Sequence, residues 1–542
     1  MSYETKEIHS TSSLPTGAVD LNARRRAALA EIDNAKFSFF HVKACAVAGV
    51  GFFTDAYDIF AINLAAGMIG YVYNMQSHKG ALTPNQDLGL KIATPVGTFI
   101  GQLLFGWLAD VVGRKKMYGL ELMVIIIATV GQAVAGHAPA ISIIGVLVFW
   151  RFIMGIGIGG DYPLSATITS EFAATRIRGR MMTATFWSQG WGQLAAALVA
   201  ISSLAAFKKQ ILNDPVDNAR HLDFVWRLII GLGAVPGAVA LYFRLTLPET
   251  PRFTMDVERN IKQAATDVDA FLQTGAYVQD STPAVAGTLD VPKASWKDFR
   301  NHFGQWKHGK VLLGTAWSWF ALDIAFYGLG LNSSIIFNAI GYGTVTSGTA
   351  QYNRYQTLFN NAVGNIIVTC AGLIPGFWAA FALIDSWGRK PLQLTGFIGL
   401  TITLCCMGFG YDKLKENAVG AFVFLYCLTN FLQNYGPNTT TFVIPGEIFP
   451  TRYRSTAHGI SAASGKFGAI VAQIIAFKLK DRGGKNAFVK HILEIFALFM
   501  MTGILSTLLI PETKGKSLEE LSGEDQDNFI GHHDTPAGAN RV

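Results

Sequence analysis

Residues 101–115 read GQLLFGWLADVVGRK, an apolar run that ends in a charged Asp-x-x-Gly-Arg-Lys motif. The same motif occurs again at residues 385–390, 275 positions further along the chain. A second pattern, Glu-x-x-x-Thr-Arg-x-Arg, begins at Glu171 and again at Glu447, 276 positions later. Because both patterns recur in the same order and at nearly the same offset, the chain is predicted to contain two halves of similar structure.

The composition is typical of a membrane protein. Half of the 542 residues are hydrophobic, the mean hydropathy is +0.31, and only 15% of the residues are charged, whereas soluble proteins carry roughly 25%. Five Cys are few for a disulfide-stapled protein, and the apolar content excludes collagen-like and disordered classes. The net charge of +7 does not indicate nucleic-acid binding, because the basic residues lie at the ends of apolar runs.

A bilayer core about 30 Å thick is crossed by a helix of about 20 apolar residues. Twelve stretches meet this requirement, at about 41–72, 92–110, 117–137, 141–166, 183–206, 224–246, 311–340, 357–384, 391–410, 419–447, 456–477 and 487–510. We therefore expect an all-α membrane protein with twelve transmembrane helices in two pseudo-symmetric six-helix halves. The expected parts are an N-terminal tail at 1–40, a first half at 41–246, a polar linker at 247–310, a second half at 311–511 and a C-terminal tail at 512–542.

The positions of Lys and Arg predict the orientation of the chain in the membrane. Short loops on the side of the N-terminus are rich in basic residues, among them Arg114, Arg178, Arg389 and Arg454. The loop near 478–490 is also basic but lies on the other side. Since cytosolic loops carry the excess of positive charge, we expect both termini and the linker in the cytosol. Two parallel six-helix halves are typical of a transporter with a binding site between them at the membrane midplane.

Ionisable residues inside the spans mark candidate sites, since a charge at the bilayer centre costs at least about 2.5–3.5 kcal/mol. Asp323 lies in the middle of the seventh span. Trp319, Asp323 and Tyr327 follow one another at intervals of four residues, so they share one face of a helix. The indole and the phenol donate hydrogen bonds, and the carboxylate accepts them or, when protonated, donates one. We interpret this face as a ligand-binding face; the alternative is a buried Asp satisfied by its neighbours.

Three carboxylates of the first half are candidates for proton transfer. Asp55 and Asp58 are three positions apart in the first span, and two carboxylates so close in a medium of low dielectric constant do not both ionise freely. The alternative is that they lie near the membrane surface. Asp161 lies in the fourth span beside Tyr162 and Pro163, where the Gly- and Pro-containing sequence predicts an irregular helix.

The other intramembrane charges are interpreted as charge-pairing or gating residues. Arg151 lies ten residues, about 15 Å along a helix, from Asp161 and therefore cannot pair with it directly. We expect Arg151 to pair with Glu121 or with an Asp of the first span. Lys466 in the eleventh span is interpreted as a counter-ion or an anion attractor, with extension to the inner membrane surface as the alternative.

The stretch 101–115 resembles the signature loop of the major facilitator superfamily. Pro-Glu-Thr follows the sixth span at 248–250 and the twelfth span at 511–513, as in the sugar-porter-like branches of that superfamily. The acidic residue of each loop faces a group of basic residues, which can hold helix ends together in one state and release them in another. Four residues in corresponding positions of the two repeats are assigned to this gate: Asp110, Arg114, Asp385 and Arg389.

Two longer stretches, GGDYPLSATITSE at 159–171 and NYGPNTT at 434–440, resemble the proton–phosphate symporters of fungi and plants, in particular the fungal high-affinity members. The resemblance implies a site for inorganic phosphate between the halves. Its side chains would be Tyr162, Gln189, Trp319, Asp323, Tyr327 and Asn434, with Asn430 as the alternative to Asn434. The resemblance also implies a plasma-membrane location. Proton coupling would fall to Asp55 or Asp58, to Asp161 and to Asp323.

The chemistry of Asp323 suits phosphate. Near neutral pH phosphate keeps at least one P–OH group from which a carboxylate can accept a hydrogen bond, whereas sulfate has none. A site that requires this donor rejects an analogue that lacks it, because buried polar groups are then left unpaired. If Asp323 is instead protonated, it donates to the anion, so binding is linked to protons in either form.

Two other functions are open alternatives. A sugar or polyol porter would share the loop motifs, although sugar sites of that branch favour a Gln pair in the seventh span, which here has Trp319, Asp323 and Tyr327. A membrane sensor would bind phosphate and signal through 247–310 and 512–542. An enzyme is not expected, since the sequence has no nucleophile–base set, metal cluster or P-loop, and no cofactor is implied. The expected partners are inorganic phosphate, protons and membrane lipid.

Overall fold

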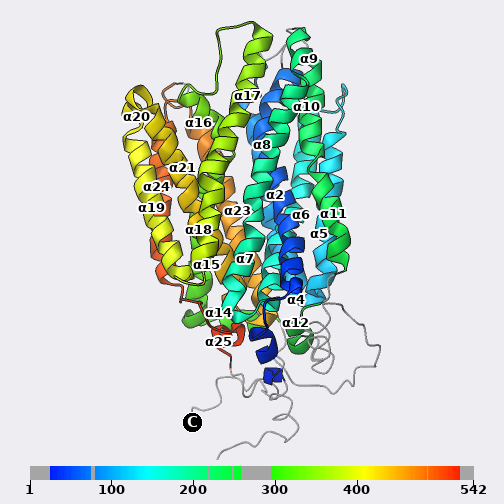
Figure 1. The fold of residues 1–542 in the computed structure, drawn as a ribbon, viewed down its shortest axis with the longest axis vertical. Helices are drawn as coiled ribbons and strands as arrows, with labels where there is room; N and C mark the ends of the chain where they lie inside the picture. Colours follow the sequence, from blue (N-terminus) through cyan, green and yellow to red (C-terminus); the bar gives the residue numbers. More distant parts are fainter. Residues whose placement is uncertain are drawn as a thin grey trace, which may run out of the picture.

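The protein is a bundle of long helices. The computed structural model describes residues 25–27, 29–74, 80–215, 219–246, 249–257, 295–484 and 486–524. Within these ranges the ordered elements are helices and one isolated β-bridge between Ala138 and Ile141. Most of the helices run along the longest axis of the molecule (Figure 1). Ten helical segments of the described chain are long and apolar enough to cross a membrane.

Each half contributes six crossings. The first half contains α2 (Phe39–Tyr73), α4 (Pro84–Val112), α5 (Arg114–Ala133), α6 (Ile143–Phe172), α7 (Arg178–Phe186) with α8 (Ser188–Ala206), and α10 (Arg220–Gly231) with α11 (Ala234–Leu245). The second half contains α15 (Trp306–Gly330), α17 (Ala350–Val368) with the π-helical turn η2 (Thr369–Leu373) and α18 (Ile374–Leu383), α19 (Arg389–Phe409), α21 (Val419–Tyr435) with α22 (Pro437–Ile448), α23 (Arg454–Leu479) and α24 (Val489–Leu508). Ten of these crossings are the long apolar segments described above. The other two, α7 with α8 and α21 with α22, bring the total to the twelve crossings expected from the sequence.

Short helices mark the two ends of the bundle. At one end lie the 3-10 turns η1 (Thr175–Ile177) and η3 (Thr451–Tyr453) with α12 (Pro251–Asp256), α14 (Trp296–Gly304) and α25 (Leu518–Ser522). We call this the basic end, because Arg114, Arg178, Arg389 and Arg454 lie there; it is the lower end in Figure 1. At the opposite end lie α9 (Lys208–Asn213), α16 (Ser333–Ala339) and α20 (Tyr411–Asn417).

Four crossings are divided into consecutive helical segments: α7 with α8, α10 with α11, α17 with η2 and α18, and α21 with α22. The break between α21 and α22 falls at Gly436, and Pro437, which lacks an N–H group, begins the next helix. The break between α7 and α8 falls at Trp187. The fourth span differs from the expectation of an irregular helix: α6 is continuous from Ile143 to Phe172, with Pro163 inside it. Packing against neighbouring helices supports a Pro-containing turn of this kind.

Described parts of the N-terminal segment, the linker and the C-terminal segment meet at the basic end of the first half. Arg252, in α12, donates to Glu519 of the C-terminal segment at 2.9 Å and to Asp33 of the N-terminal segment at 2.9 Å. A third hydrogen bond joins Arg252 to the backbone carbonyl of Glu171. The rest of the expected linker, residues 258–294, and most of both tails lie outside the described residues.

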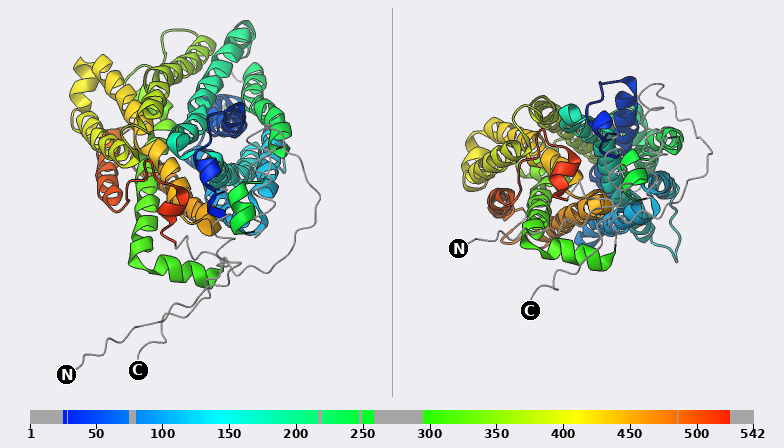
Figure 2. Two further views of the ribbon diagram at one scale, coloured as in Figure 1. Left: turned by 60° about the horizontal axis from the view of Figure 1, so that its bottom comes forward. Right: turned by 90° about the horizontal axis from the view of Figure 1, so that it is seen from below.

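The closest helix packing inside the first half joins α4 and α6 through facing glycines. A Cβ on Gly97 of α4 would lie 2.1 Å from the carbonyl oxygen of Phe152, and one on Gly159 of α6 would lie 2.5 Å from that of Thr98. Gly101 and Gly155 occupy the matching positions one turn away, so both helices carry a Gly-x-x-x-Gly pair. This contact fixes the position of the segment of α6 that follows Gly159, which includes Asp161 and Tyr162. The two halves lie side by side, with α23 of the second half against α4 of the first (Figure 2).

We predict that Gly159→Val destabilises the fold. The added side chain would press on the backbone of α4, which cannot move aside without separating the helices, and overpacking of this kind costs roughly 1–3 kcal/mol. The melting temperature of the detergent-solubilised protein should fall below that of the matched variant Gly420→Val, because a Cβ at Gly420 meets no atom within 4 Å. Equal melting temperatures for the two variants would contradict the packing argument.

Candidate functional site

An ion pair between Asp323 and Lys466 lies at the centre of the bundle. Asp323 is on α15 and Lys466 is on α23, and the Nζ atom of Lys466 lies 2.8 Å from Oδ2 of Asp323. Both side chains are almost completely buried. Gly465 allows the close approach of the two helices, because a Cβ there would lie 2.5 Å from the ring of Trp319. A buried charge is tolerated only when it is paired, so each residue fixes the other in place.

Two tyrosine rings, one from each half, face the ammonium group of Lys466. Its Nζ atom lies 4.5 Å from the ring centre of Tyr327 and 4.9 Å from that of Tyr162. Tyr162 comes from α6 of the first half, and its ring centre lies 6.3 Å from that of Trp319. A cation is attracted to an aromatic face without using an N–H donor. The arrangement therefore holds the cation while leaving donors for an anion.

The structure brings most of the expected substrate-binding residues together. Tyr162, Trp319, Asp323 and Tyr327 surround Lys466, and Gln189 lies 3.5 Å from the hydroxyl of Tyr162.

Among the described residues, no hydrogen bond or ion pair joins Asn434 to this group. Its Nδ2 atom donates to the carbonyl oxygen of Asn430 at 2.7 Å, and its Oδ1 atom accepts from Asn438 at 2.7 Å. The side chain of Asn430 donates to the carbonyl oxygen of Tyr426 at 2.9 Å. The described hydrogen bonds of both side-chain amides thus lie within α21 and α22. The assignment of Asn434, and not Asn430, to the substrate site stays a prediction.

A second buried charge cluster, in the first half, is centred on Arg244. From the last turn of α11, Arg244 donates to Glu121 of α5 at 2.6 Å and to Asp161 of α6 at 2.7 Å. Its guanidinium lies 4.2 Å from the ring centre of Tyr118, and Ser165 donates to the second carboxylate oxygen of Asp161. One arginine therefore binds two buried carboxylates from two other helices.

Arg244 was not expected from the sequence. It lies at the end of the sixth span, where a long basic side chain normally extends to the membrane surface. The structure turns it inward instead, into space left by Gly51 of α2: a Cβ on Gly51 would lie 1.6 Å from Nη2 of Arg244. The only sequence signal was a glycine in one span and an arginine in another, and nothing in the sequence pairs them.

Only one of the two partners expected for Arg151 acts on it. Its Nε atom donates to the carbonyl oxygen of Leu90 at 2.8 Å, while Glu121 is held by Arg244. The expected pairing of Arg151 with Glu121 is therefore wrong, because a closer arginine binds that carboxylate. The other expected partner was an Asp of the first span, and the negative charge of Asp58 in that span does act on Arg151.

Asp55 and Asp58 lie in the middle of α2 and are fully buried, which argues against a position near the membrane surface. Thr129 donates to one oxygen of Asp58 at 2.8 Å, and the other oxygen has no hydrogen-bond partner in the described structure. Both oxygens of Asp55 are buried without a hydrogen-bond partner in the same ranges. An unpartnered buried carboxylate is costly when charged, so these two groups are suited to carry a proton.

The two loop motifs make reciprocal contacts between the halves at the basic end. Asp110 accepts a hydrogen bond from the backbone N–H of Thr456 at 2.7 Å, in the first turn of α23. Asp385 accepts one from the backbone N–H of Arg180 at 2.9 Å, in the first turn of α7. Arg180 and Thr456 are themselves equivalent in the repeat, so the two contacts are related by the pseudo-symmetry. Each Asp satisfies an N–H group that a helix start leaves free.

Arginines and glutamates of the two repeats extend these contacts. Each motif arginine pairs within its own half: Arg114 lies 3.2 Å from Asp110 and 3.5 Å from Glu171, and Arg389 lies 2.9 Å from Asp385 and 2.7 Å from Glu447. Across the halves, Arg114 donates to the carbonyl oxygen of Thr451 at 2.8 Å, and Arg454 lies 2.8 Å from Glu171. One buried ion pair and one hydrogen bond therefore add to the contacts that hold the halves together at this end.

Contacts between the halves also occur at the opposite end. Asn63 of α2 donates to the hydroxyl of Ser333 at 2.5 Å. Lys91 of α4 donates to Oδ1 of Asn332 at 3.2 Å. The pair of Asp323 and Lys466 thus lies between two sets of contacts, one at each end of the interface between the halves.

Comparison with known proteins identifies the family. The family described as "Sugar (and other) transporter" matches residues 44–524. The chain belongs to this family. The major facilitator fold, with twelve transmembrane helices in two halves, is therefore confirmed, and the protein is an integral membrane protein.

Individual relatives match over nearly the whole chain. The chain is 51% identical to the "Repressible high-affinity phosphate permease" of Neurospora crassa, over 93% of this chain and 90% of that one. It is 51% identical to the "Inorganic phosphate transporter PHO84" of Saccharomyces cerevisiae, over 92% of this chain and 87% of that one. Among solved structures, the proton:xylose symporter XylE of the major facilitator superfamily shares the fold, with a TM-score of 0.65 at 20% identity over 90% of this chain and 99% of that one.

We predict that Asp110→Asn and Asp385→Asn each loosen the basic end to a similar extent, because the two contacts are equivalent. The measurement is the alkylation rate of Thr167→Cys, in a background without the five native cysteines, by a hydrophilic maleimide. Thr167 is buried against Ser455 of the other half, so its reaction requires the halves to separate. Each variant should raise the rate several-fold.

The matched control is Asp412→Asn on α20, at the opposite end, where Asp412 pairs with Lys490. This variant should leave the rate unchanged. A rate that rises for Asp110→Asn but not for Asp385→Asn would show that the two contacts are not equivalent.

Proposed function

We propose that this protein carries inorganic phosphate across the membrane together with protons, by alternating access of a site between its two halves. The observation that carries the proposal is the ion pair of Asp323 and Lys466, enclosed by Tyr162 and Tyr327 from different halves. The names of relatives that are 51% identical, a phosphate permease and a phosphate transporter, support phosphate as the substrate.

The ion pair links the anion to a proton. Lys466 is the cation of the site, and in this structure its ammonium group is bound to the carboxylate of Asp323. A phosphate anion that approaches Lys466 meets a negative charge already in place, and like charges at this distance repel strongly in a medium of low dielectric constant. Protonation of Asp323 removes that charge, frees Lys466 for the anion and provides an O–H donor. Phosphate and a proton therefore bind together.

The surrounding side chains provide the remaining hydrogen bonds. The hydroxyls of Tyr162 and Tyr327 donate or accept, and the indole N–H of Trp319 and the amide of Gln189 donate to phosphate oxygens. A site with a single lysine and several neutral donors binds an anion without holding it so tightly that release becomes slow. The sugar alternative is not favoured, since the relatives at 51% identity are named for phosphate.

The first half provides a second proton site. Asp55 has no hydrogen-bond partner in the described structure and interacts electrostatically with Asp161 and Arg244. Movement of Arg244 away from Asp161 during the transport cycle would change the distribution of charge around both Asp55 and Asp161. We assign proton transfer in this half to Asp55, Asp58 and Asp161.

The contacts at the two ends act as alternating gates. The basic end would face the cytosol, with both termini on that side, because positive charge accumulates there. The contacts of Asp110 and Asp385 would then close the cytosolic side, and those of Asn63 and Lys91 the outer side. Transport requires the two sets to open in turn. Uptake from outside would place the protein in the plasma membrane, where it acts as a carrier and not as an enzyme.

The decisive experiment is uptake of radiolabelled phosphate into proteoliposomes that contain the purified protein. Uptake should be driven by an inward proton gradient and competed by arsenate, which keeps a protonated oxygen, but not by sulfate. Asp323→Asn should abolish accumulation, because an amide keeps the size of the carboxylate but exchanges no proton. Asp412→Asn, far from the site, should transport normally. Uptake by Asp323→Asn at the normal rate and still driven by the gradient would exclude this assignment.

A second prediction separates proton coupling from substrate binding. We expect Asp55→Asn to retain exchange between phosphate-loaded sides of the liposome but to lose accumulation driven by a pH gradient. Exchange needs only reorientation of the loaded carrier, so a neutral residue at this position does not block it. Asp58→Asn and Asp161→Asn are measured alongside, since loss of the Asp161 carboxylate removes one of the two buried ion pairs of Arg244 and should also reduce the amount of folded protein. Gradient-driven uptake that is unchanged in all three variants would move proton coupling to Asp323 alone.

A further inference from the structure

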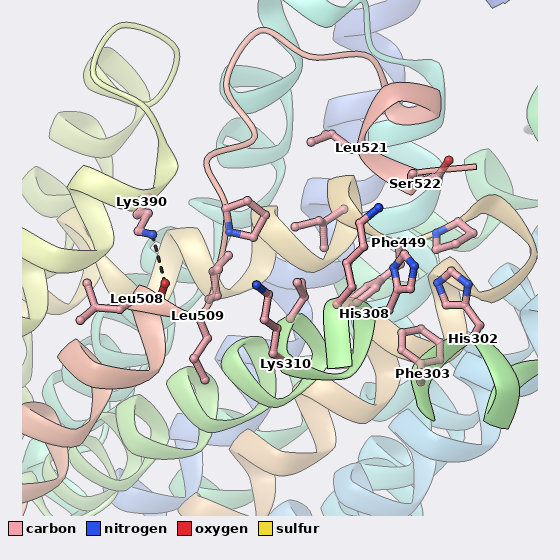
Figure 3. Close-up of a pocket in the computed structure, with 17 residues that line it drawn as sticks. His302, Phe303, His308, Lys310, Lys390, Phe449, Leu508, Leu509, Leu521 and Ser522 are labelled. Atoms are coloured by element: carbon pink, nitrogen blue, oxygen red, sulfur yellow. Dashed lines mark hydrogen bonds between the residues drawn. The ribbon is translucent and has the colours of Figure 1, made fainter. Parts of the chain in front are cut away.

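A cavity of about 360 Å³ lies at the basic end of the second half, away from the central ion pair (Figure 3). It is formed where α14, the start of α15, the start of α19, the loop after α22, the end of α24 and the segment at α25 come together. Its volume is in the range of small-molecule binding sites. The transport proposal gives this cavity no role.

The charged groups that line the cavity are all basic. They are Lys307 and Lys310 of α15 and Lys390 of α19, and none of the lining residues is Asp or Glu. Within the described residues none of these three lysines forms an ion pair; Lys390 donates to the carbonyl oxygen of Leu508 at 3.3 Å. Three ammonium groups around one cavity repel one another unless an anion lies between them.

Three carboxylates near the cavity bind other groups. Glu512 accepts hydrogen bonds from the backbone N–H groups of Arg389 and Lys390 at 3.0 and 2.9 Å. Asp298 of α14 lies 3.0 Å from Arg452, and Glu524, just beyond α25, is bound by the same arginine. These two acidic groups therefore do not neutralise the lysines of the cavity. The positive charge is left for a ligand.

Two histidines complete the polar wall. The rings of His302 and His308 stack with their centres 4.0 Å apart, and in Figure 3 both lie below the segment that carries Ser522. Burial, His308 and Arg452 together lower the pKa of His302 to about 4. His302 is therefore neutral at physiological pH and acts as a hydrogen-bond donor, and its low pKa reflects in part the positive charge around it.

The rest of the cavity is apolar and lies beside two exposed tryptophans. Its apolar side chains include Phe303, Val311, Phe449, Leu508 and Ile510. Trp296 at the start of α14 is 76% exposed, and Trp306 at the start of α15 is 68% exposed. Tryptophans with this exposure at the ends of membrane helices sit among lipid headgroups. The cavity thus lies at the depth where phospholipid phosphates are found.

We propose that this cavity binds a phosphate ester with more than one negative charge, presented by the headgroup of an acidic phospholipid such as a phosphoinositide. Lys307, Lys310 and Lys390 hold the phosphate oxygens, and the apolar wall accepts the start of the lipid chains. Clusters of basic residues at this depth recognise such headgroups. A soluble phosphate ester would share the charged part of this chemistry but would leave the apolar wall unused.

A ligand here would also act on the gate at the basic end. Phe449 lines the cavity and lies two residues before Thr451, whose carbonyl oxygen accepts the hydrogen bond from Arg114 of the other half. Lys390 directly follows Arg389, which pairs with Asp385. The bound headgroup would therefore stabilise the two segments that close this end.

The test is direct binding of a fluorescent dioctanoyl phosphatidylinositol bisphosphate to the full-length protein in detergent, followed by fluorescence polarisation. The double variant Lys307→Gln, Lys310→Gln should weaken binding by roughly tenfold to thirtyfold, since each removed cation weakens attachment to an anionic headgroup. The matched control, Lys413→Gln with Lys415→Gln on α20, removes two lysines at the opposite end and should bind normally. Lys310→Arg, which keeps the charge, should retain most of the affinity.

The competitors distinguish the source of the ligand. Dioctanoyl phosphatidylcholine and inorganic phosphate should not compete, and soluble inositol trisphosphate should compete less well than the lipid. If inositol trisphosphate competes as strongly as the lipid, the cavity is still an anion-binding site, but its ligand is a soluble phosphate ester and not a phospholipid. Binding that is equal in the Lys307, Lys310 double variant and the control variant, with unchanged melting temperatures in both, would overturn the proposal.

Discussion

A charge inside a membrane must be paired, and the arrangement of this bundle depends on that constraint. At the centre, Asp323 has Lys466; in the first half, Arg244 has both Glu121 and Asp161. Each pair joins residues of different helices, so moving one helix leaves a charge behind, which is costly in a medium of low dielectric constant. Glycines at Gly51 and Gly465 make these pairs possible by giving the charged side chains or their helices room.

The same constraint explains how such a structure can move. A paired charge resists displacement until a competing charge takes the partner's place, and a proton or an anion can do so. In the proposed transport cycle, the central pair is both a structural contact and the point at which ligands act on the fold. Proton binding and anion binding would each replace one partner of the existing ion pair.

The fold could be predicted almost completely from the sequence, since apolar runs and the repeated motifs at Asp110 and Asp385 are local signals. The face of α15 with Trp319, Asp323 and Tyr327 was also a local signal, because helical spacing fixes it. What could not be predicted was which helix faces which. Arg244 was missed, and Glu121, one of the two partners expected for Arg151, is bound by Arg244 instead. Pairing between distant spans depends on tertiary packing that no spacing encodes. The continuity of α6 through Pro163 also depends on neighbouring helices.

The reciprocal contacts of Asp110 with Thr456 and of Asp385 with Arg180 have the geometry of an isologous dimer interface. In such an interface a residue of one subunit binds its counterpart site on the other subunit, and the reverse contact follows by symmetry. Here the two subunits are halves of a single chain. A six-helix half on its own would lack the carboxylate that its own helix start requires, and two copies of such a half would supply it to each other. The duplicated architecture therefore preserves, within one polypeptide, the bonding pattern of a homodimer.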